Sequence, residues 1–388
     1  MRHSSERLEP AYLRRVRGSG FGGGEVSMMR WLAPLLLMAW TTLPALAVRI
    51  VSLSDLRQIL TEGRGTSDER MARRIGGLEL SERLSGTELA RWEAAMPGEK
   101  SRQALALLAD TAAFLDTPVL PEIGTTAPET EAQLHMVTLA VQYVSSVLPR
   151  LPNFTATRET RRYLEMKPVG PNGKETMLPH QPIHAVGDAV ETLLYRNGEE
   201  TVDPPEMAQM NAGLLGPQLT THGVFGAMLG IVMGDALRGR LVWGRWEQDA
   251  DNPAAVFRFI VPKEKSHYSV EFCCFQFGKV RNQEFREYAA YHGEMALDPT
   301  TGAVLRLMIV ADMESLAPIL KSGILVEYGP VLIGGSTSYC PVRSVSMQVE
   351  WEYGTELMQT SLNEVSFSKY HKFGTESRVL TGNDGETP

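Results

Sequence analysis

Hydrophobic residues recur at helical spacing in the first part of the chain that follows its N-terminal apolar run. The apolar positions between Leu53 and Leu60 share one face behind Ser52, a residue type that caps helix N-termini. Further amphipathic segments follow, and one of them opens at Ser85 with the Ser-Gly-Thr-Glu pattern of a capping box. We therefore expect residues 48–117 to form a small domain of short helices.

The pattern changes after a segment rich in proline and threonine, residues 118–128, which is typical of a linker. A long amphipathic helix is predicted from Glu129 to Leu148, with an apolar stripe formed by Leu134, Val137, Val141, Val144 and Leu148. Short, often alternating stretches rich in β-branched and aromatic residues then predict about ten strands: 154–164, 185–195, 240–246, 256–261, 267–274, 292–297, 303–310, 323–328, 339–349 and 365–370.

Turn residues indicate that neighbouring strands run antiparallel. Asn197-Gly198, Asp298–Gly302 and Gly334-Gly335 supply the positive φ angles that tight reversals need. One helix, capped by Thr221 and running to Leu237, interrupts the strands. The expected fold class is α+β: a small N-terminal helical bundle, then a helix and a curved antiparallel sheet wrapped on helices over residues 129–373. Residues 374–388 are polar and are expected to be a disordered tail.

The N-terminus carries a predicted export signal. A charge-free apolar run follows Arg30 and ends in Ala-Leu-Ala at Ala47, small residues that suit a signal peptidase. Residues 1–47 are therefore expected to be a Sec-type signal peptide, with the true start at Met28 or Met29. The mature chain would be periplasmic or secreted, with no membrane span after cleavage. An uncleaved anchor and a twin-arginine signal remain alternatives.

Composition narrows the class of partner. The chain has 38 Lys and Arg against 46 Asp and Glu, a net charge of −8. Clusters of basic residues, on which binding to a phosphate backbone relies, are lacking after residue 47, so no nucleic-acid partner is expected.

Cys273, Cys274 and Cys340 fall in two predicted strands of what we interpret as one sheet. In an oxidising compartment we expect one disulfide, between Cys340 and either Cys273 or Cys274, because adjacent residues of a strand point to opposite faces. Three unpaired thiols remain the alternative. A metal site is disfavoured because no histidine lies at ligand spacing from these sulfurs.

The histidines do not form a recognisable metal motif. His180, His184 and Asp188 are close in sequence, but Pro179 and Pro182 disfavour the helix that would place both imidazoles on one face. Loop histidines in solvent are the preferred interpretation.

Other polar groups give no catalytic motif. His292, Glu294 and Asp298 alternate along one predicted strand, which is typical of a polar sheet face. Asp235 lies near the end of the inserted helix, but the chain has no Gly-x-Ser-x-Gly nucleophile elbow. We therefore expect no catalytic residues, no bound metal and no cofactor.

Four apolar residues are candidates for lining a ligand pocket. Trp243 and Trp246 share one strand, and Phe225 and Met228 lie in the inserted helix. Packing in the core is the alternative role for these side chains.

The block Tyr291–Arg306, followed by Val326-Glu327-Tyr328 and Val331–Gly335, resembles the strand pattern of the lipoprotein-carrier and sigma-factor regulatory protein superfamily. The chain as a whole resembles a group of exported acidobacterial proteins of unknown function. The superfamily resemblance covers residues 130–373 and implies a half-open β barrel lined by apolar side chains, which in the carriers accepts acyl chains. No diagnostic functional residue of the carriers has a match.

These expectations lead to a function hypothesis with two alternatives. The leading hypothesis is an exported, non-enzymatic binding protein for a lipid or another hydrophobic ligand of the envelope. The alternatives are a protein-interaction or regulatory module that binds an envelope protein, and a hydrolase-like enzyme. A carrier needs an apolar cavity in the concavity of the sheet, so a concavity filled by helix 221–237 would weaken that hypothesis.

Overall fold

The computed structural model describes residues 48–115, 126–169, 180–203, 219–249, 252–277, 280–313, 319–352 and 357–373. The predicted signal peptide, most of the predicted linker and the predicted tail lie outside these residues.

The N-terminal segment is helical and has its own core. Ser52 caps its first helix, where the hydroxyl accepts from the Asp55 amide and the Asp55 carboxylate accepts from the Ser52 amide. A short parallel pair of strands, which the sequence pattern did not predict, joins the helices. The elements are β1 (Arg49–Val51), α1 (Leu53–Glu62), α2 (Asp68–Ile75), β2 (Leu78–Leu80), α3 (Gly86–Glu93) and α4 (Glu99–Thr111).

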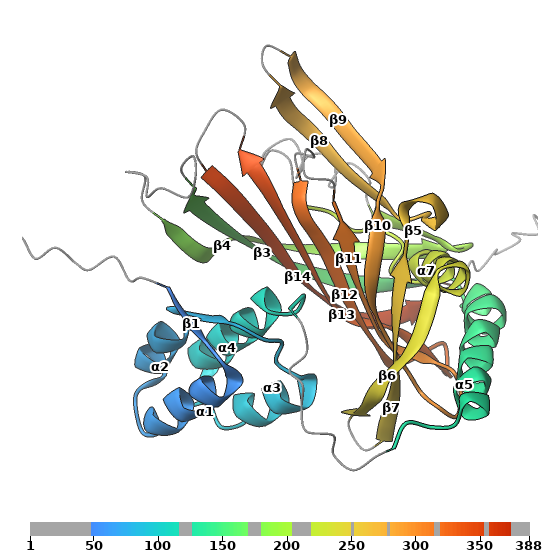
Figure 1. Ribbon diagram of the computed structural model, residues 1–388, viewed down its shortest axis with the longest axis horizontal. Helices are drawn as coiled ribbons and strands as arrows, with labels where there is room; N and C mark the ends of the chain where they lie inside the picture. Colours follow the sequence, from blue (N-terminus) through green and yellow to red (C-terminus); the bar gives the residue numbers. More distant parts are fainter. Residues whose placement is uncertain are drawn as a thin grey trace, which may run out of the picture. The chain divides into compact units, whose positions relative to one another are not determined.

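The rest of the chain builds a ten-stranded, curved and unclosed antiparallel sheet (Figure 1), which confirms the α+β class. The strand order is β5-β4-β3-β14-β13-β12-β11-β10-β7-β6. The strands are β3 (Phe154–Pro168), β4 (Gln181–Arg196), β5 (Glu199–Asp203), β6 (Arg240–Asp249), β7 (Asn252–Val261), β10 (Ala290–Leu297), β11 (Val304–Asp312), β12 (Ile319–Ile333), β13 (Ser336–Glu352) and β14 (Leu357–Lys372). A separate hairpin is formed by β8 (Ser269–Phe277) and β9 (Val280–Tyr288).

The predicted turn residues connect neighbouring strands. Asn197 and Gly198, between β4 and β5, have φ angles of 54° and 88°. Gly334 and Gly335, between β12 and β13, have φ angles of 59° and 88°. Both central residues of each two-residue turn are therefore left-handed, as hairpins with matched strand twist require.

Among the described residues, two helical segments pack on one face of the sheet, which we call the inner face (Figure 1). One is α5 (Thr130–Gln142), which continues as the π-helical turn η1 (Tyr143–Val147) and the 3-10 turn η2 (Leu148–Arg150). The other is α7 (Ala227–Arg238). None of the described helices is long and apolar enough to cross a membrane.

The structure corrects two details of these helices. Leu134, predicted on the buried stripe of α5, is 62% exposed, and Met136 and Ala140 are buried instead. The helix α7 begins after Gly226 rather than at the predicted Thr221 cap. The sequence pattern identified both helices, and Val137, Val141, Val144 and Leu148 of the predicted stripe do contact the inner core, so only Leu134 and the start of α7 were misplaced.

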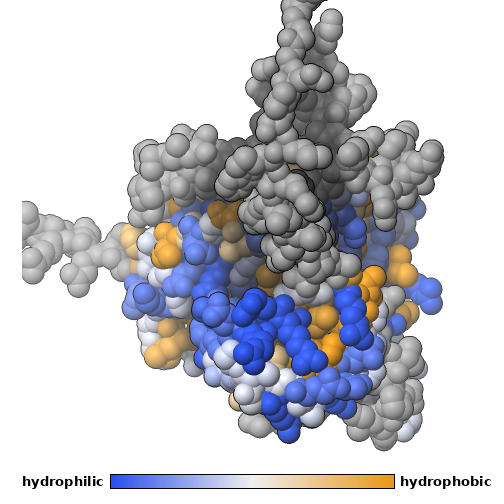
Figure 2. All heavy atoms as spheres, turned by 90° about the vertical axis from the view of Figure 1, so that its left-hand side faces the viewer, coloured by the Kyte–Doolittle hydropathy of each residue, from blue (hydrophilic) through white to orange (hydrophobic). Residues whose placement is uncertain are grey.

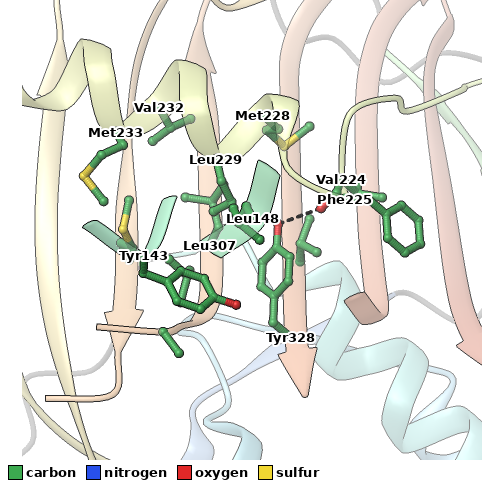
Figure 3. Packing of buried hydrophobic residues seen from close by; sticks show 14 of the residues in the cluster. Tyr143, Leu148, Val224, Phe225, Met228, Leu229, Val232, Met233, Leu307 and Tyr328 are labelled. Carbon is green, nitrogen blue, oxygen red and sulfur yellow. Dashed lines mark hydrogen bonds between the residues drawn. The ribbon is translucent and has the colours of Figure 1, made fainter. Parts of the chain in front are cut away.

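The inner-face core is apolar and closely packed around α7. Met228, Leu229, Val232 and Met233 of α7 belong to one buried cluster with residues of the sheet and of the α5 segment (Figure 3). The hydroxyl of Tyr328 donates to the Val224 carbonyl at 3.0 Å, which fixes the chain that leads into α7. This part of the sheet concavity is therefore filled by the protein's own side chains.

The opposite face, which we call the outer face, contacts the N-terminal helical segment. Phe114, just after α4, is buried in a cluster that includes Met347 of β13. Gly323 of β12 makes room for this ring, because a Cβ atom there would lie 2.7 Å from it. Arg343 of the sheet binds the buried Asp110 carboxylate of α4.

A second contact between the helical segment and the sheet is a buried ion network centred on Glu294 of β10. Its carboxylate accepts from Arg83 at 2.8 Å, from Arg245 at 2.7 and 2.9 Å, and from Arg258 at 3.2 Å. Arg83 comes from the loop between β2 and α3, and the side chains of Arg83 and Glu294 are only 8% and 7% exposed. Burial alone would raise the pKa of Glu294, but Arg245 and Arg83 outweigh it and hold that pKa well below 4.5.

Glu294→Gln is expected to lower the free energy of unfolding by about 3 kcal/mol at pH 7, because it leaves buried arginines without their counter-charge. A carboxylate with a lowered pKa stabilises the fold above its unfolded-state pKa, and this contribution is lost as the pH falls toward the folded-state pKa. The gap between wild type and variant should therefore shrink below about pH 4.5. Urea unfolding across pH measures it. Glu99→Gln, which breaks an exposed pair with Arg102, is the control and should have little effect.

Candidate functional site

A cavity of about 440 Å3 opens on the inner face beside α7. Its floor is formed by β12, β13 and β14, and its walls come from the residues leading into α7 and from the start of β8. The described lining residues are Leu219, Thr220, Thr221, His222, Met228, Tyr268, Ser269, Val270, Glu271, Ser322, Gly323, Ile324, Ser346, Gln348, Glu350 and Ser361. We refer to this cavity as the inner pocket.

The inner pocket lies where the inner face changes from apolar to polar along three adjacent strands. The side chains that point toward the inner face are Tyr328, Val326, Ile324 and Ser322 on β12, Ser344, Ser346 and Gln348 on β13, and Phe367, Val365, Asn363 and Ser361 on β14. The apolar members belong to the core around α7, whereas several polar members form the pocket floor. Ser346 and Gln348 are only 3% and 7% exposed.

Sequence reasoning missed this floor because alternation does not say which face is buried. The segment Ser344–Gln348 alternates serine or glutamine with valine and methionine. Such a pattern is typical of a strand whose polar side meets water. In the structure the apolar side chains contact the N-terminal helical segment on the outer face, and the polar ones turn toward the pocket.

The acidic side chains of the inner pocket already have donors. The Glu350 carboxylate accepts from the Gln348 amide at 3.0 Å and from the Gln359 amide at 2.9 Å. The Glu271 carboxylate accepts from Arg286 at 3.0 Å and from the Ser269 hydroxyl at 3.3 Å. Their negative charges are therefore partly compensated by the protein itself.

Two serine hydroxyl groups of the pocket floor, unlike the acidic side chains, have no hydrogen-bond partner among the described residues. Within the described part of the chain, no hydrogen bond engages the side chain of Ser322 or Ser346. Asn363, beside the pocket, is used structurally, because its amide donates to the Leu219 carbonyl at 2.6 Å and ties the pocket wall to β14. The pocket thus presents unengaged hydroxyls beside polar side chains that already have partners.

A second cavity of about 480 Å3 adjoins the first. It shares His222, Met228, Tyr268 and Ser269 with the inner pocket and extends toward Glu200 of β5. The Glu200 carboxylate accepts from the Phe225 amide at 2.8 Å, and burial raises its pKa. His222 lies at the junction of the two cavities, where desolvation and then the positive charge of Arg158 lower its pKa.

Asp235, near the end of α7, binds a histidine in the structure. Its carboxylate is fully buried and accepts from the backbone and ring nitrogens of His267, both at 2.7 Å, and from the Tyr291 hydroxyl at 3.0 Å. Arg238 also binds it at 2.6 Å. Burial would raise the pKa of Asp235, but these hydrogen bonds lower it. No serine hydroxyl binds His267 in the described ranges, so the cluster contains no serine nucleophile and instead anchors the end of α7.

The four predicted pocket residues do not gather in one place. Met228 lines both cavities. Phe225 is 1% exposed and packs in an aromatic cluster with Phe154, Tyr195, Phe367 and Tyr370.

Trp243 and Trp246 lie away from both cavities. Their rings contact each other, with centroids 5.0 Å apart, because a bulge in β6 turns both toward the inner core while Arg245 points to the outer face. Within the four predicted positions, only Met228 is a described lining residue of the two cavities.

The histidine candidates have local partners. His180 binds Glu165 at 2.9 Å, and His184 binds the Pro182 carbonyl at 2.9 Å. The interpretation of this stretch as a loop was wrong for His184, which lies in β4, although its side chain is exposed as expected.

The predicted polar sheet face is not one surface in the structure, because His292, Glu294 and Asp298 have three separate roles. His292 pairs with Asp312 in solvent, and Glu294 holds the buried arginines of the outer face. Asp298 lies beyond the end of β10 and caps the turn through the amides of Thr300 and Thr301. In the described ranges no three acidic, histidine or cysteine side chains are arranged to hold a metal.

The expected disulfide is corrected at Cys340, which is buried and free in the structure. The physical reason is topological. Cys340 lies in β13 of the large sheet, whereas Cys273 and Cys274 lie in β8 of the separate hairpin, so the expectation that they share a sheet was wrong. The side chains of Cys273 and Cys274 lie outside the described ones.

Comparisons of the chain with protein-family models, with curated proteins and with solved structures find no match. The resemblance to the lipoprotein-carrier and sigma-factor regulatory superfamily therefore stays a prediction.

Asp235→Asn is expected to lower the free energy of unfolding by about 2–4 kcal/mol, because an amide cannot accept all the donors that meet this buried carboxylate. Asp312→Asn is the matched control, since Asp312 also binds a histidine but is 48% exposed, and it should change stability little. Chemical denaturation of both variants at pH 7 measures the difference. Equal effects would contradict an anchoring role for the buried cluster.

Proposed function

We propose that this chain is an exported, non-enzymatic binding protein whose ligand is a small polar molecule held in the inner pocket. The observation that carries the proposal is the polar floor of β12, β13 and β14. Ser322 and Ser346 are at most 9% exposed, and their hydroxyls have no hydrogen-bond partner among the described residues. Polar groups placed in the interior normally have partners, so a ligand or ordered water is needed there.

This proposal departs from the expected acyl-chain carrier. The apolar part of the concavity is occupied by side chains of α7 and of the α5 segment (Figure 3). The space that is left is lined partly by apolar side chains, such as Met228 and Ile324, and partly by hydroxyl, amide and carboxylate groups, and an acyl chain would leave these polar groups without water or partners. A ligand with its own hydrogen-bonding groups suits this lining better than a lipid tail.

The alternative of a protein-interaction module has less support. Large exposed apolar side chains are spread over different elements, including Ile50 of β1, Leu134 of α5, Val190 of β4 and Leu332 of β12. On the described part of the face in Figure 2, hydrophobic residues are interspersed with many hydrophilic ones. Docking of a partner is expected to need a more continuous apolar patch.

The proposed location is the periplasm or the cell exterior. It rests on the N-terminal apolar run that ends at Ala47. The location is testable independently of the ligand, by fractionating cells and sequencing the N-terminus of the recovered protein. A mature N-terminus at Val48 in the envelope or medium is expected, and an intact N-terminus in the cytoplasm would contradict it.

The ligand itself is tested by native mass spectrometry of protein purified from its own cells, followed by denaturation and extraction. A polar molecule is expected to copurify at near-stoichiometric amount. Ser346→Phe should abolish its retention by filling the cavity, whereas Thr192→Phe, the same type of enlargement at an exposed position of β4, should not.

A milder variant keeps the test informative if Ser346→Phe fails to fold. Replacing Ser322 and Ser346 by alanine removes two hydroxyls without adding volume and should weaken binding by about tenfold for each lost hydrogen bond. Retention of the same molecule by all variants, or of a molecule with a long acyl chain, would contradict the proposal.

A further inference from the structure

Two arginines on β3 have buried nitrogen atoms without any partner. The Nε atoms of Arg158 and Arg162 are shielded from solvent and make no hydrogen bond. No ion pair or hydrogen bond of either side chain occurs in the described part of the structure. A buried donor that lacks an acceptor destabilises a fold, and the cost is larger when the group is charged.

Both arginines lie on the inner face. Phe154 and Ala156 of β3 belong to the inner core, and alternation along the strand places Arg158 and Arg162 on the same side. Their neighbour Arg161 points to the opposite face and is exposed. The spacing therefore sets two guanidinium groups on one side of one strand.

Neither arginine is among the described lining residues of the two cavities, but each lies near a residue that is. Arg162 is opposite Asn363 in the register of β3 and β14, and Asn363 holds the pocket residue Leu219. Arg158 is near enough to lower the pKa of His222, which lines both cavities. The strand that carries the arginines is thus the next one beyond the polar floor.

The acidic groups near Arg158 do not neutralise it by direct contact. Burial lowers the pKa of Arg158, Glu191 and Glu200 raise it by attraction, and Arg162 lowers it further by repulsion. Neither Glu191 nor Glu200 forms an ion pair with it, and Glu200 accepts from the backbone of Phe225 instead. The Glu350 and Glu271 carboxylates of the pocket also have their own donors.

We propose that Arg158 and Arg162 bind the anionic group of the pocket's ligand, so that the ligand is a small polar molecule carrying a carboxylate or a phosphate. This inference rests on the proposed function and names its ligand class. Guanidinium groups suit either anion because each presents several donors in one plane. An anion there accepts from the terminal nitrogens of the two guanidinium groups, which form no ion pair in the described part of the structure, while the hydroxyls of Ser322 and Ser346 contact the rest of the molecule.

Titration of the purified, 15N-labelled chain with inorganic phosphate and with acetate tests this class, with chloride at matched ionic strength as the reference. The Nε–Hε resonances of the arginines are followed by NMR. Saturable shifts of two such resonances are expected below about 50 mM, a range that detects millimolar affinity. They should disappear in Arg158→Gln and Arg162→Gln respectively, and persist in the exposed control Arg161→Gln.

A second measurement does not depend on anion affinity. If the two guanidinium groups are unpaired without ligand, Arg158→Met should raise the melting temperature of the ligand-free protein, because it removes a buried charge that has no partner. Added phosphate should stabilise the wild type but not this variant. Arg161→Met should change neither property.

The outcomes separate this inference from the proposed function. Absence of saturable arginine shifts with either anion overturns the anionic class, and a neutral or cationic copurifying ligand that Ser346→Phe excludes would leave the pocket proposal standing. Protein that copurifies with no small molecule contradicts both. A preference for phosphate over acetate, or the reverse, decides between the two anions.

Discussion

The packing of a wide sheet against the much narrower helices that the structure describes is the constraint on which the rest of the structure depends. Ten strands at the usual spacing are roughly 45 Å across, whereas one helix with its side chains is about 10–12 Å wide. Of the helices that the structure describes, α7 and the α5 segment pack on part of the inner face. The apolar inward residues of β12 and β14 coincide with the part that these two helices contact, and polar residues continue along the same strands beyond it.

On the outer face, the N-terminal helical segment contacts the sheet through ion pairs as well as through apolar side chains. Arg306, Glu327 and Arg343 are successive neighbours across β11, β12 and β13, so charges alternate in sign along one row. The helical segment adds Arg83 to an acidic centre and Asp110 to a basic one. Buried ion pairs add little net stability compared with apolar packing, but a mismatched position would leave unpaired charges, so they define how the segment sits.

Sequence patterns predicted the helices, strands and turns better than they predicted what the side chains of these elements contact. Capping at Ser52, turns at Asn197-Gly198 and Gly334-Gly335, and the antiparallel strands depend on residues close in sequence, and these predictions are confirmed. The inner pocket could not be predicted, because Ser346 has the same alternating neighbours whether its face meets water or a cavity. The bulge that brings Trp243 and Trp246 together, and the separate hairpin that carries Cys273, likewise depend on pairing partners distant in the sequence.

The ion pair between Arg83 and Glu294 also has a consequence for the order of folding. The two residues are 211 positions apart, and Arg83 belongs to the part of the chain that is synthesised first. The helices around it can form from local contacts, but their docking surface exists only after β10 and its neighbours have paired. Attachment of the helical segment is therefore expected to be a late step, during which its charged and apolar contact residues remain exposed to other chains.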